Sequence, residues 1–155
     1  MLKLTKKADY GLIAMRHLAE HAKDGAFSTK DLADAYTIPQ EALAKILQRL
    51  ARAGLLVSQH GSNGGYMLAR DPRQISALEV IRAIDGPLFM TSCFSNRDCD
   101  QTPRCTVREP LRRVGESIQQ VLGRLTIFEM TRGENEGGET LEPVELVTLG
   151  GPAGV

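Results

Sequence analysis

Cys93, Cys99 and Cys105 are the only cysteines of the chain, and they stand six residues apart in the segment CFSNRDCDQTPRC. The residues between them are mostly polar or charged, so this segment is expected to be a loop rather than part of a hydrophobic core. Three thiols cannot all pair within one chain. In a reducing compartment, thiols gathered in this way indicate metal ligation or redox chemistry more than structural disulfides.

The spacing of the cysteines favours a large metal centre. A six-residue interval is wider than the CxxC pairs common at structural zinc sites, and it allows the loop to wrap an object such as an iron–sulfur cluster. Such a cluster usually has four protein ligands, whereas the loop offers three thiols and no histidine. We therefore expect a cluster, of two-iron or four-iron type, with one ligand that the loop does not supply.

The composition is that of one globular domain, or of a small domain with an added dimerisation element. The chain has 155 residues, of which 42% are hydrophobic and 25% are charged. No run approaches the ~20 apolar residues of a membrane-spanning helix. The N-terminus lacks the apolar stretch and cleavage site of a signal peptide, so we expect a cytoplasmic protein without membrane contacts.

The net charge of zero hides an asymmetry along the chain. Residues 1–130 contain 18 of the 19 basic residues and 14 of the 19 acidic ones, whereas residues 131–155 contain one arginine and five glutamates. A basic body followed by an acidic tail is compatible with nucleic-acid binding.

The expected elements are three helices, a hairpin and a fourth helix. Helical spacing of apolar residues runs over about 5–22, a capping box at Ser28 predicts a short second helix, and a third helix covers about 39–53. The next segments, LLVSQ and GYMLAR, flank a glycine-rich turn and predict a β-hairpin. Ser76 then caps a helix over 77–84.

This order predicts a winged helix-turn-helix, a mainly α fold with a small β-hairpin. In such a domain the third helix enters the major groove of double-stranded DNA. Gln40 and Glu41 are then placed for base edges, and Lys45, Gln48 and Arg49 continue the same face, with the two cations suited to phosphates. Taken alone, a charged face of this kind is more often a plain solvent-exposed surface.

The hairpin tip strengthens the DNA-binding interpretation. Its residues are small and flexible, and their amides can approach a sugar–phosphate backbone, although an exposed turn is the ordinary role of such a sequence. The other candidate DNA contacts lie at the start of the second helix and in the hairpin: Ser28, Thr29, Ser58, His60, Ser62 and Asn63.

Apolar residues after the cysteine loop follow a heptad pattern for three repeats. The positions are Val107, Leu111, Val114, Ile118, Val121, Leu125 and Phe128. Few residues of the same chain remain to pack against them, so we expect a second copy of the chain to bury this face. A two-fold homodimer would also place two recognition helices on one palindromic operator.

These observations divide the chain into four expected segments. They are a winged helix-turn-helix domain at 1–86, a cysteine-rich cluster-binding loop at 87–106, a long C-terminal dimerisation helix at 107–130, and an acidic, glycine-rich, disordered tail at 131–155.

Three further residues have ordinary explanations. His17 and His21 are four apart on the first helix, a spacing that can hold a metal, but their polar neighbours favour a solvent-exposed face. Asp9 opens the same helix, where a carboxylate favours the helix dipole. We find no nucleophile–base pair, phosphate-binding loop or substrate domain, and so expect no enzyme and no small-molecule substrate.

Several stretches together resemble a known family. They are LTKKADYGL (4–12), IPQEALAKILQRLARAGLL (38–56), GSNGGYMLAR (61–70), ISALEVIRAIDG (75–86) and the three-cysteine loop. The chain resembles the iron–sulfur winged-helix transcription regulators of the IscR, NsrR and RirA type, especially regulators of the SUF cluster-assembly operon. The resemblance covers about residues 1–130, and the wing combined with the cysteine loop is far more specific than either part.

The resemblance implies a homodimeric repressor or activator whose cluster state changes its affinity for DNA, with Cys93, Cys99 and Cys105 as cluster ligands. IscR-like members have a histidine three residues after the third cysteine. Here that position is Arg108, which stays protonated and is a poor ligand. In NsrR-like members an aspartate near the start of the first helix, donated by the partner chain, completes the site, and Asp9 aligns with it.

The alternative that remains open is a zinc-stabilised or metal-free winged-helix regulator. In that case the same three cysteines would act as a direct thiol redox switch.

Overall fold

The computed structural model describes residues 3–94 and 99–133. Residues 95–98 of the cysteine loop lie outside the described residues, and so does the expected acidic tail from residue 134 onward. Within the described ranges, no helix combines the length and the hydropathy needed to cross a membrane.

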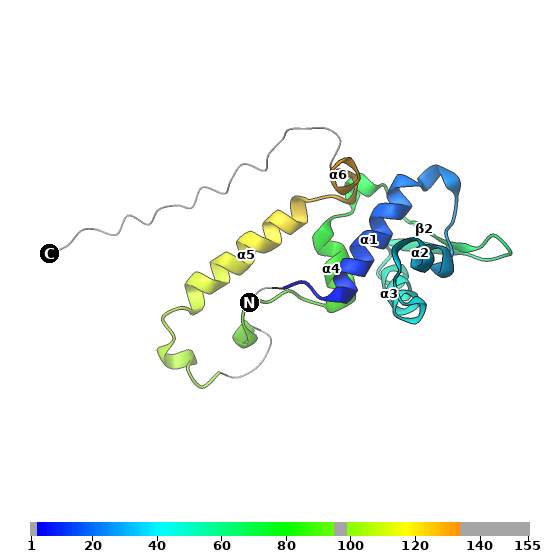
Figure 1. The fold of residues 1–155 in the computed structure, drawn as a ribbon. Coiled ribbons are helices and arrows are strands. Elements are labelled where there is room, and N and C mark those ends of the chain that lie inside the picture. Colours follow the sequence, from blue (N-terminus) through cyan, green and yellow to red (C-terminus); the bar gives the residue numbers. More distant parts are fainter. Residues whose placement is uncertain (1–2, 95–98, 134–155) are drawn as a thin grey trace.

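Three helices form the first part of the fold (Figure 1). Their bounds are α1 Lys6–Glu20, α2 Thr29–Tyr36 and α3 Gln40–Arg52, with a 3-10 turn, η1, over Ala22–Asp24. Local sequence sets their ends. The side chain of Thr5 caps α1, Ser28 and Asp31 form the expected capping box of α2, and Gly54 follows α3 with φ 78°. Pro39 is the N-cap of α3 rather than its first helical residue.

The hairpin follows α3 directly and projects away from the helices (Figure 1). Its strands are β1 Leu56–Gln59 and β2 Gly65–Leu68, paired antiparallel. Phe27, just before α2, exchanges two backbone hydrogen bonds with Tyr66 of β2, at N···O distances of 3.1 and 2.8 Å. A Cβ at Gly65 would lie 2.2 Å from the carbonyl oxygen of Phe27, so this attachment of the wing requires glycine.

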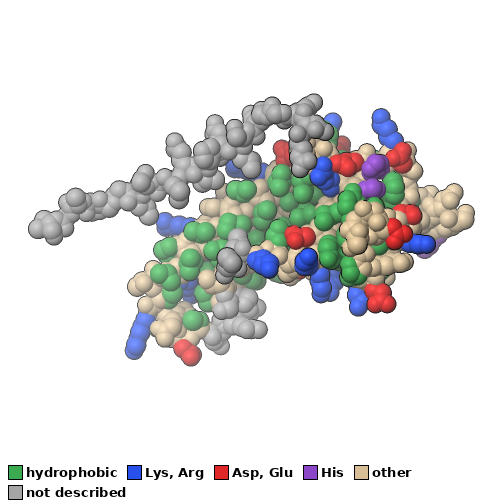
Figure 2. All heavy atoms as spheres, viewed as in Figure 1, with side chains coloured by type: hydrophobic (Ala, Val, Ile, Leu, Met, Phe, Trp, Pro, Cys, Tyr) green, Lys and Arg blue, Asp and Glu red, His purple; other side chains and the backbone are tan. Residues whose placement is uncertain are grey.

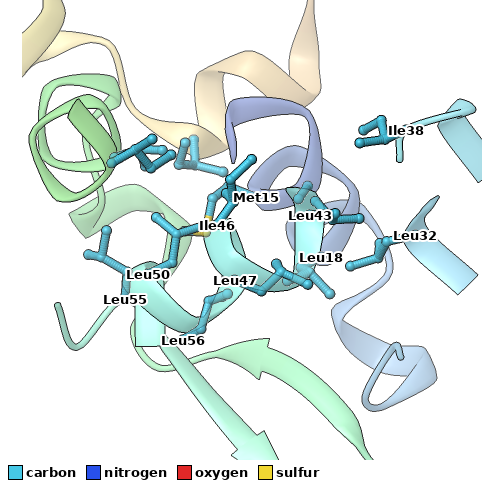
Figure 3. Packing of buried hydrophobic residues seen from close by; sticks show 14 of the residues in the cluster. Met15, Leu18, Leu32, Ile38, Leu43, Ile46, Leu47, Leu50, Leu55 and Leu56 are labelled. Atoms are coloured by element: carbon cyan, nitrogen blue, oxygen red, sulfur yellow. The ribbon is translucent and has the colours of Figure 1, made fainter. Parts of the chain in front are cut away.

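The hydrophobic core lies where α1, α2, α3 and the hairpin meet (Figure 3). The face of α3 that the sequence predicted to be buried is buried: Leu43, Ile46, Leu47 and Leu50 are at most 2% exposed. Met15 and Leu18 of α1 pack on them. Each such side chain contributes about 1.5–3 kcal/mol through burial, so the core fixes how α3 sits on the domain.

The next elements lead into the cysteine loop. A 3-10 turn, η2 (Pro72–Gln74), precedes α4 (Ala77–Asp85), which Ser76 and Glu79 begin with a capping box and Gly86 ends with φ 79°. The loop itself contains two short 3-10 turns, η3 (Ser92–Phe94) and η4 (Thr102–Arg104).

The heptad segment forms two helices, which corrects the expected single helix through residue 130. α5 covers Arg108–Arg124 and α6 covers Ile127–Arg132. Between them, the carbonyl of Leu125 accepts from Ala77 N–H at 2.8 Å and Ile127 N–H donates to Ile75 at 2.9 Å. Thr126 then caps α6, and Ile127 is fully buried. These long-range bonds outweigh the local preference for a continuous helix.

The fold is therefore mainly α with one antiparallel hairpin, as predicted. A winged helix-turn-helix domain is followed by α5, which lies apart from α1–α3, and by α6, which packs against α1 (Figure 1).

Candidate DNA-binding surface and cysteine loop

The outer face of α3 presents the polar residues that the sequence singled out. Gln40, Glu41, Lys45 and Gln48 are all exposed, opposite the buried leucines. The turn before α3 is tight because Thr37 adopts φ 54° and its N–H caps the end of α2 on the carbonyl of Ala33. The core and this turn hold the first turn of α3 at the surface, in the position that a recognition helix needs.

Ser28 and Thr29 lie at the start of α2 and are half-buried. The hydroxyl of Ser28 accepts from the Asp31 N–H at 3.1 Å, which leaves its own proton available for a phosphate oxygen. The hydrogen bonds from Ser28 hold the pKa of the Asp31 carboxyl below its usual value. The capping box thus fixes the Ser28 hydroxyl at the half-buried start of α2, a helix that packs against α3.

The wing candidates Ser58, His60, Ser62 and Asn63 are all exposed. Ser58 lies in β1, and the other three form the turn between the strands. The structure therefore leaves each of them accessible, while the pairing of Phe27 with Tyr66 holds β2 close to the turn.

Arg49 departs from the arrangement expected for a residue that only contacts phosphate. Its Nη1 donates to the carbonyl oxygen of Ile84, in the last turn of α4, at 2.7 Å. Sequence reasoning placed Arg49 by helical periodicity alone. The partner is 35 residues away, so nothing local could indicate this bond.

The three cysteines are free thiols. Cys93 and Cys105 are half-buried and Cys99 is exposed, and the hydroxyl oxygen of Thr91 lies 2.9 Å from Sγ of Cys93. Within residues 3–94 and 99–133, no three side chains of the His, Cys, Asp or Glu type are grouped as metal ligands. The thiols suit an iron–sulfur cluster in their chemistry, but the described conformation does not bring them together.

Arg108 opens α5 immediately after the loop. Its guanidinium carbon lies 5.8 Å from the ring centroid of Phe94, a cation–π distance. A cation therefore lies close to the segment that bears Cys93.

Asp9 is exposed in the first turn of α1. The start of that helix is tied to the end of α4, because Oγ1 of Thr5 donates to Oδ2 of Asp85 at 2.7 Å. The cysteine loop begins shortly after α4, so α1 starts beside the segment that leads into the loop. The resemblance to NsrR-like regulators implied Asp9 as a candidate ligand, but it did not reveal this tie.

His17 and His21 have local partners. Nδ1 of His17 lies 2.7 Å from the Tyr36 hydroxyl, and Nδ1 of His21 lies 3.1 Å from Oδ2 of Asp24. The two rings are 4.4 Å apart between centroids. Burial and the neighbouring His21 lower the pKa of His17. His17 therefore connects α1 to the last residue of α2, and both histidines are half-buried rather than on the solvent-exposed face that their polar neighbours favoured.

The outer face of α5 exposes large apolar side chains. Val107, Val114 and Val121 recur every seven residues and are 55%, 46% and 47% exposed. Figure 2 shows hydrophobic side chains gathered along α5 on the face in view. One heptad position thus remains uncovered within the described part of the chain.

Residues 4–133 match the sequence pattern of the Rrf2 family, which is described as an iron-dependent transcriptional regulator. The chain belongs to the Rrf2 family. This Rrf2 protein is 31% identical, over 133 residues, to the HTH-type transcriptional regulator IscR of Xenorhabdus nematophila, a match that covers 86% of this chain and 81% of that relative.

Two solved structures of similar fold are also regulators. CymR of B. subtilis, titled the global cysteine regulator, superposes with a TM-score of 0.74 at 29% identity over 87% of this chain and all of that one. T. potens IscR gives a TM-score of 0.69 at 30% identity, over 88% and 94%. The matched relatives are transcriptional regulators, so this Rrf2 protein is a DNA-binding winged-helix regulator and not an enzyme.

Proposed function

We propose that this Rrf2 regulator is a cytoplasmic homodimer whose affinity for a palindromic operator depends on an iron–sulfur cluster. The observation that carries the proposal is the position of three free thiols in the segment that joins the winged domain to α5. Cys93, Cys99 and Cys105 would hold the cluster, and Asp9 of the partner subunit would complete the site. When bound, the cluster would serve as the sensor, because its charge and its ligation change in response to iron, oxygen or nitric oxide.

The residues of this chain would supply the DNA affinity. Gln40 and Glu41 would contact base edges in the major groove, while Lys45 would contact phosphate and fix the register. The hydroxyls and amides of the wing and of the start of α2 would add backbone contacts. Two copies related by a two-fold axis would repeat these contacts on two half-sites.

Dimerisation through α5 is supported by the exposed valines at heptad spacing. Covering them with a second α5 removes apolar surface from water and brings the two cysteine loops into one assembly. A partner carboxylate could then reach the thiols, which agrees with the lack of a complete ligand group within the described residues of one chain.

A second candidate function is a regulator whose cysteines respond directly to oxidants, without a cluster. The similarity to CymR of B. subtilis favours it, as does a TM-score of 0.68, at 25% identity, to a structure titled as the oxidized form of Staphylococcus aureus CymR. The exposed Cys99 would be the first thiol to react.

Anaerobic purification distinguishes the two candidates. The first predicts a brown protein with iron and acid-labile sulfide in fixed ratio to the chain, both lost in a Cys99→Ser variant. A colourless protein, metal-free or containing zinc, whose DNA binding responds to peroxide would support the second candidate and contradict the first.

A further inference from the structure

The end of α4 is the place where the helices of the winged domain meet the segment that leads to the thiols. Ile84 and Asp85 are the last residues of α4, and Gly86 ends the helix. Cys93 follows seven residues after Gly86. We call Ile84, Asp85 and Gly86 the α4 junction.

Two helices hold the α4 junction from the side of the winged domain. Arg49 of α3 donates to the Ile84 carbonyl at 2.7 Å, and Thr5 at the start of α1 donates to the Asp85 carboxylate at 2.7 Å. Ile84 is 3% exposed and packs against Gly11 of α1, where an added Cβ would lie 2.1 Å from Ile84 Cδ1. A shift of the junction therefore cannot occur without a response from α1 and α3.

The segment after the junction is held by α5. Nε2 of Gln119 donates to the Leu88 carbonyl at 3.0 Å, and its Oε1 accepts from Nη2 of Arg82 at 2.7 Å. Residues 84–88 are thus fixed by α3 at one end and by the dimerisation helix at the other, directly before the cysteine loop.

The Arg49 bond is suited to transmit movement. The Ile84 carbonyl is one of the last carbonyls of α4, and these have no hydrogen-bond partner within the helix. The Arg49 guanidinium supplies a donor for it, and its positive charge interacts favourably with the negative end of the helix dipole. Arg49 follows Lys45 by one turn of α3, and the two side chains therefore share one side of the helix. A displacement of the Ile84 carbonyl acts next to the surface that would lie on the DNA.

We propose that Arg49 is a positioning residue that couples the state of the cysteine loop to the placement of α3 on DNA. This inference rests on the proposed cluster-dependent function. A change of ligation at the thiols displaces residues 84–88, and Arg49 carries that displacement into the recognition helix. Arg49 thereby contributes to the difference in affinity between the two states, and not only to the affinity itself.

The test compares Arg49→Gln with Lys45→Gln as the matched control on the same face. Affinity is measured for a duplex operator selected from a random pool, at fixed salt, with cluster-loaded and cluster-free protein. Arg49→Gln is expected to reduce the ratio of the two affinities by about two- to thirty-fold, with iron and sulfide per chain unchanged. Lys45→Gln is expected to weaken both states equally and to lower the salt slope by about one.

Two other outcomes for Arg49→Gln would overturn the inference. An unchanged ratio with a lowered melting temperature means that Arg49 only caps α4, and an equal loss in both states means that it only contacts phosphate. A wild-type ratio of one overturns the proposed function itself. Arg49→Lys keeps a donor and is expected to recover part of the ratio. If Arg49→Gln fails to fold, Arg49→Met, which keeps a long side chain but has no donor, replaces it, and a wild-type ratio in that variant overturns the coupling.

Discussion

Asp9 lies exposed in the first turn of α1, at the end of the helix that Thr5 ties to Asp85. Its carboxylate interacts favourably with the positive end of the helix dipole, and this interaction alone can explain an acidic residue at that position. The position three residues after Cys105 holds Arg108, which stays protonated and is a poor ligand. A carboxylate from a second chain is therefore our candidate for the missing ligand of the proposed cluster.

Replacing Asp9 by alanine should leave the fold intact and weaken the cluster, because one ligand is lost. We expect Asp9→Ala to contain less iron and sulfide after anaerobic purification and to lose its visible absorption faster in air. Asp34→Ala, which removes an exposed carboxylate from α2, serves as the control. An absorption spectrum and an iron content equal to those of wild type would remove Asp9 from the site.

A mixed dimer tests whether the carboxylate comes from the partner. One chain carries Asp9→Ala and the other carries Cys93→Ser. If Asp9 acts across the dimer, one site keeps all its ligands and half of the cluster content remains. If Asp9 acts within its own chain, both sites lack a ligand and the cluster content falls to that of the single variants.

His17 makes the stability of the winged domain depend on pH. Burial and the nearby His21 lower its pKa, so the unfolded chain binds a proton more readily than the folded one. The contribution of His17 to the free energy of unfolding is therefore fully present above about pH 6.5. It is lost as the pH drops from there toward the lowered pKa of the folded state. We expect His17→Gln to reduce the fall in melting temperature between neutral pH and pH 5. His60→Gln, in the exposed wing, is the control. A pH profile of His17→Gln identical to that of wild type would contradict this role of His17.

Residues whose partners are close in sequence were predicted well. Ser28 with Asp31, Ser76 and Gly54 all take the capping roles that their neighbours indicate. The bonds from Arg49 to Ile84 and from His17 to Tyr36 join residues on different helices. Periodicity assigns such side chains to a face but does not determine which partner they meet.

At the scale of elements, α5 combines a packed face with an uncovered one. A Cβ added at Gly123 would lie 3.6 Å from the Leu78 side chain of α4, and one at Gly115 would lie 3.1 Å from the Met90 side chain. Val107, Val114 and Val121 point away from these contacts and stay exposed. An isolated helix with such a stripe is expected to pair with its copy.

A charge at the centre of this stripe should separate the proposed dimer. We expect Val114→Glu to weaken dimerisation about tenfold or more, because an unpaired carboxylate would be buried between the two helices. Light scattering after size-exclusion chromatography measures the mass, and operator affinity should fall in parallel. Gln120→Glu adds the same charge at an exposed position of α5 and should leave the dimer intact. A dimer that persists in Val114→Glu would place the interface elsewhere.

The division between α5 and α6 shows where sequence patterns stop being sufficient. The heptad positions continue through Leu125 and Phe128, so a single helix was expected. The backbone of Leu125 and Ile127 instead pairs with Ala77 and Ile75, about 50 residues earlier. A heptad pattern cannot distinguish a long helix from two helices whose junction is used to attach the segment to the domain.

At the scale of the whole molecule, the cysteine loop is the connection between two functional parts. The winged domain would bind DNA, α5 would bind the second copy, and the thiols lie between them in the chain. The element order and the family could be predicted from sequence because motifs with fixed spacing carry them. The arrangement of the thiols in space could not, because it depends on a ligand group that one described chain does not complete.

The central claim is that the state of the cysteine loop sets the affinity for DNA. The most direct measurement is the dissociation constant for a selected palindromic duplex, at fixed salt and without oxygen, of cluster-loaded protein and of the same preparation after removal of the cluster. Couplings of this kind usually change affinity by about 5- to 150-fold, and we predict a difference in that range. Equal dissociation constants for the two forms, both folded and dimeric, would contradict the account.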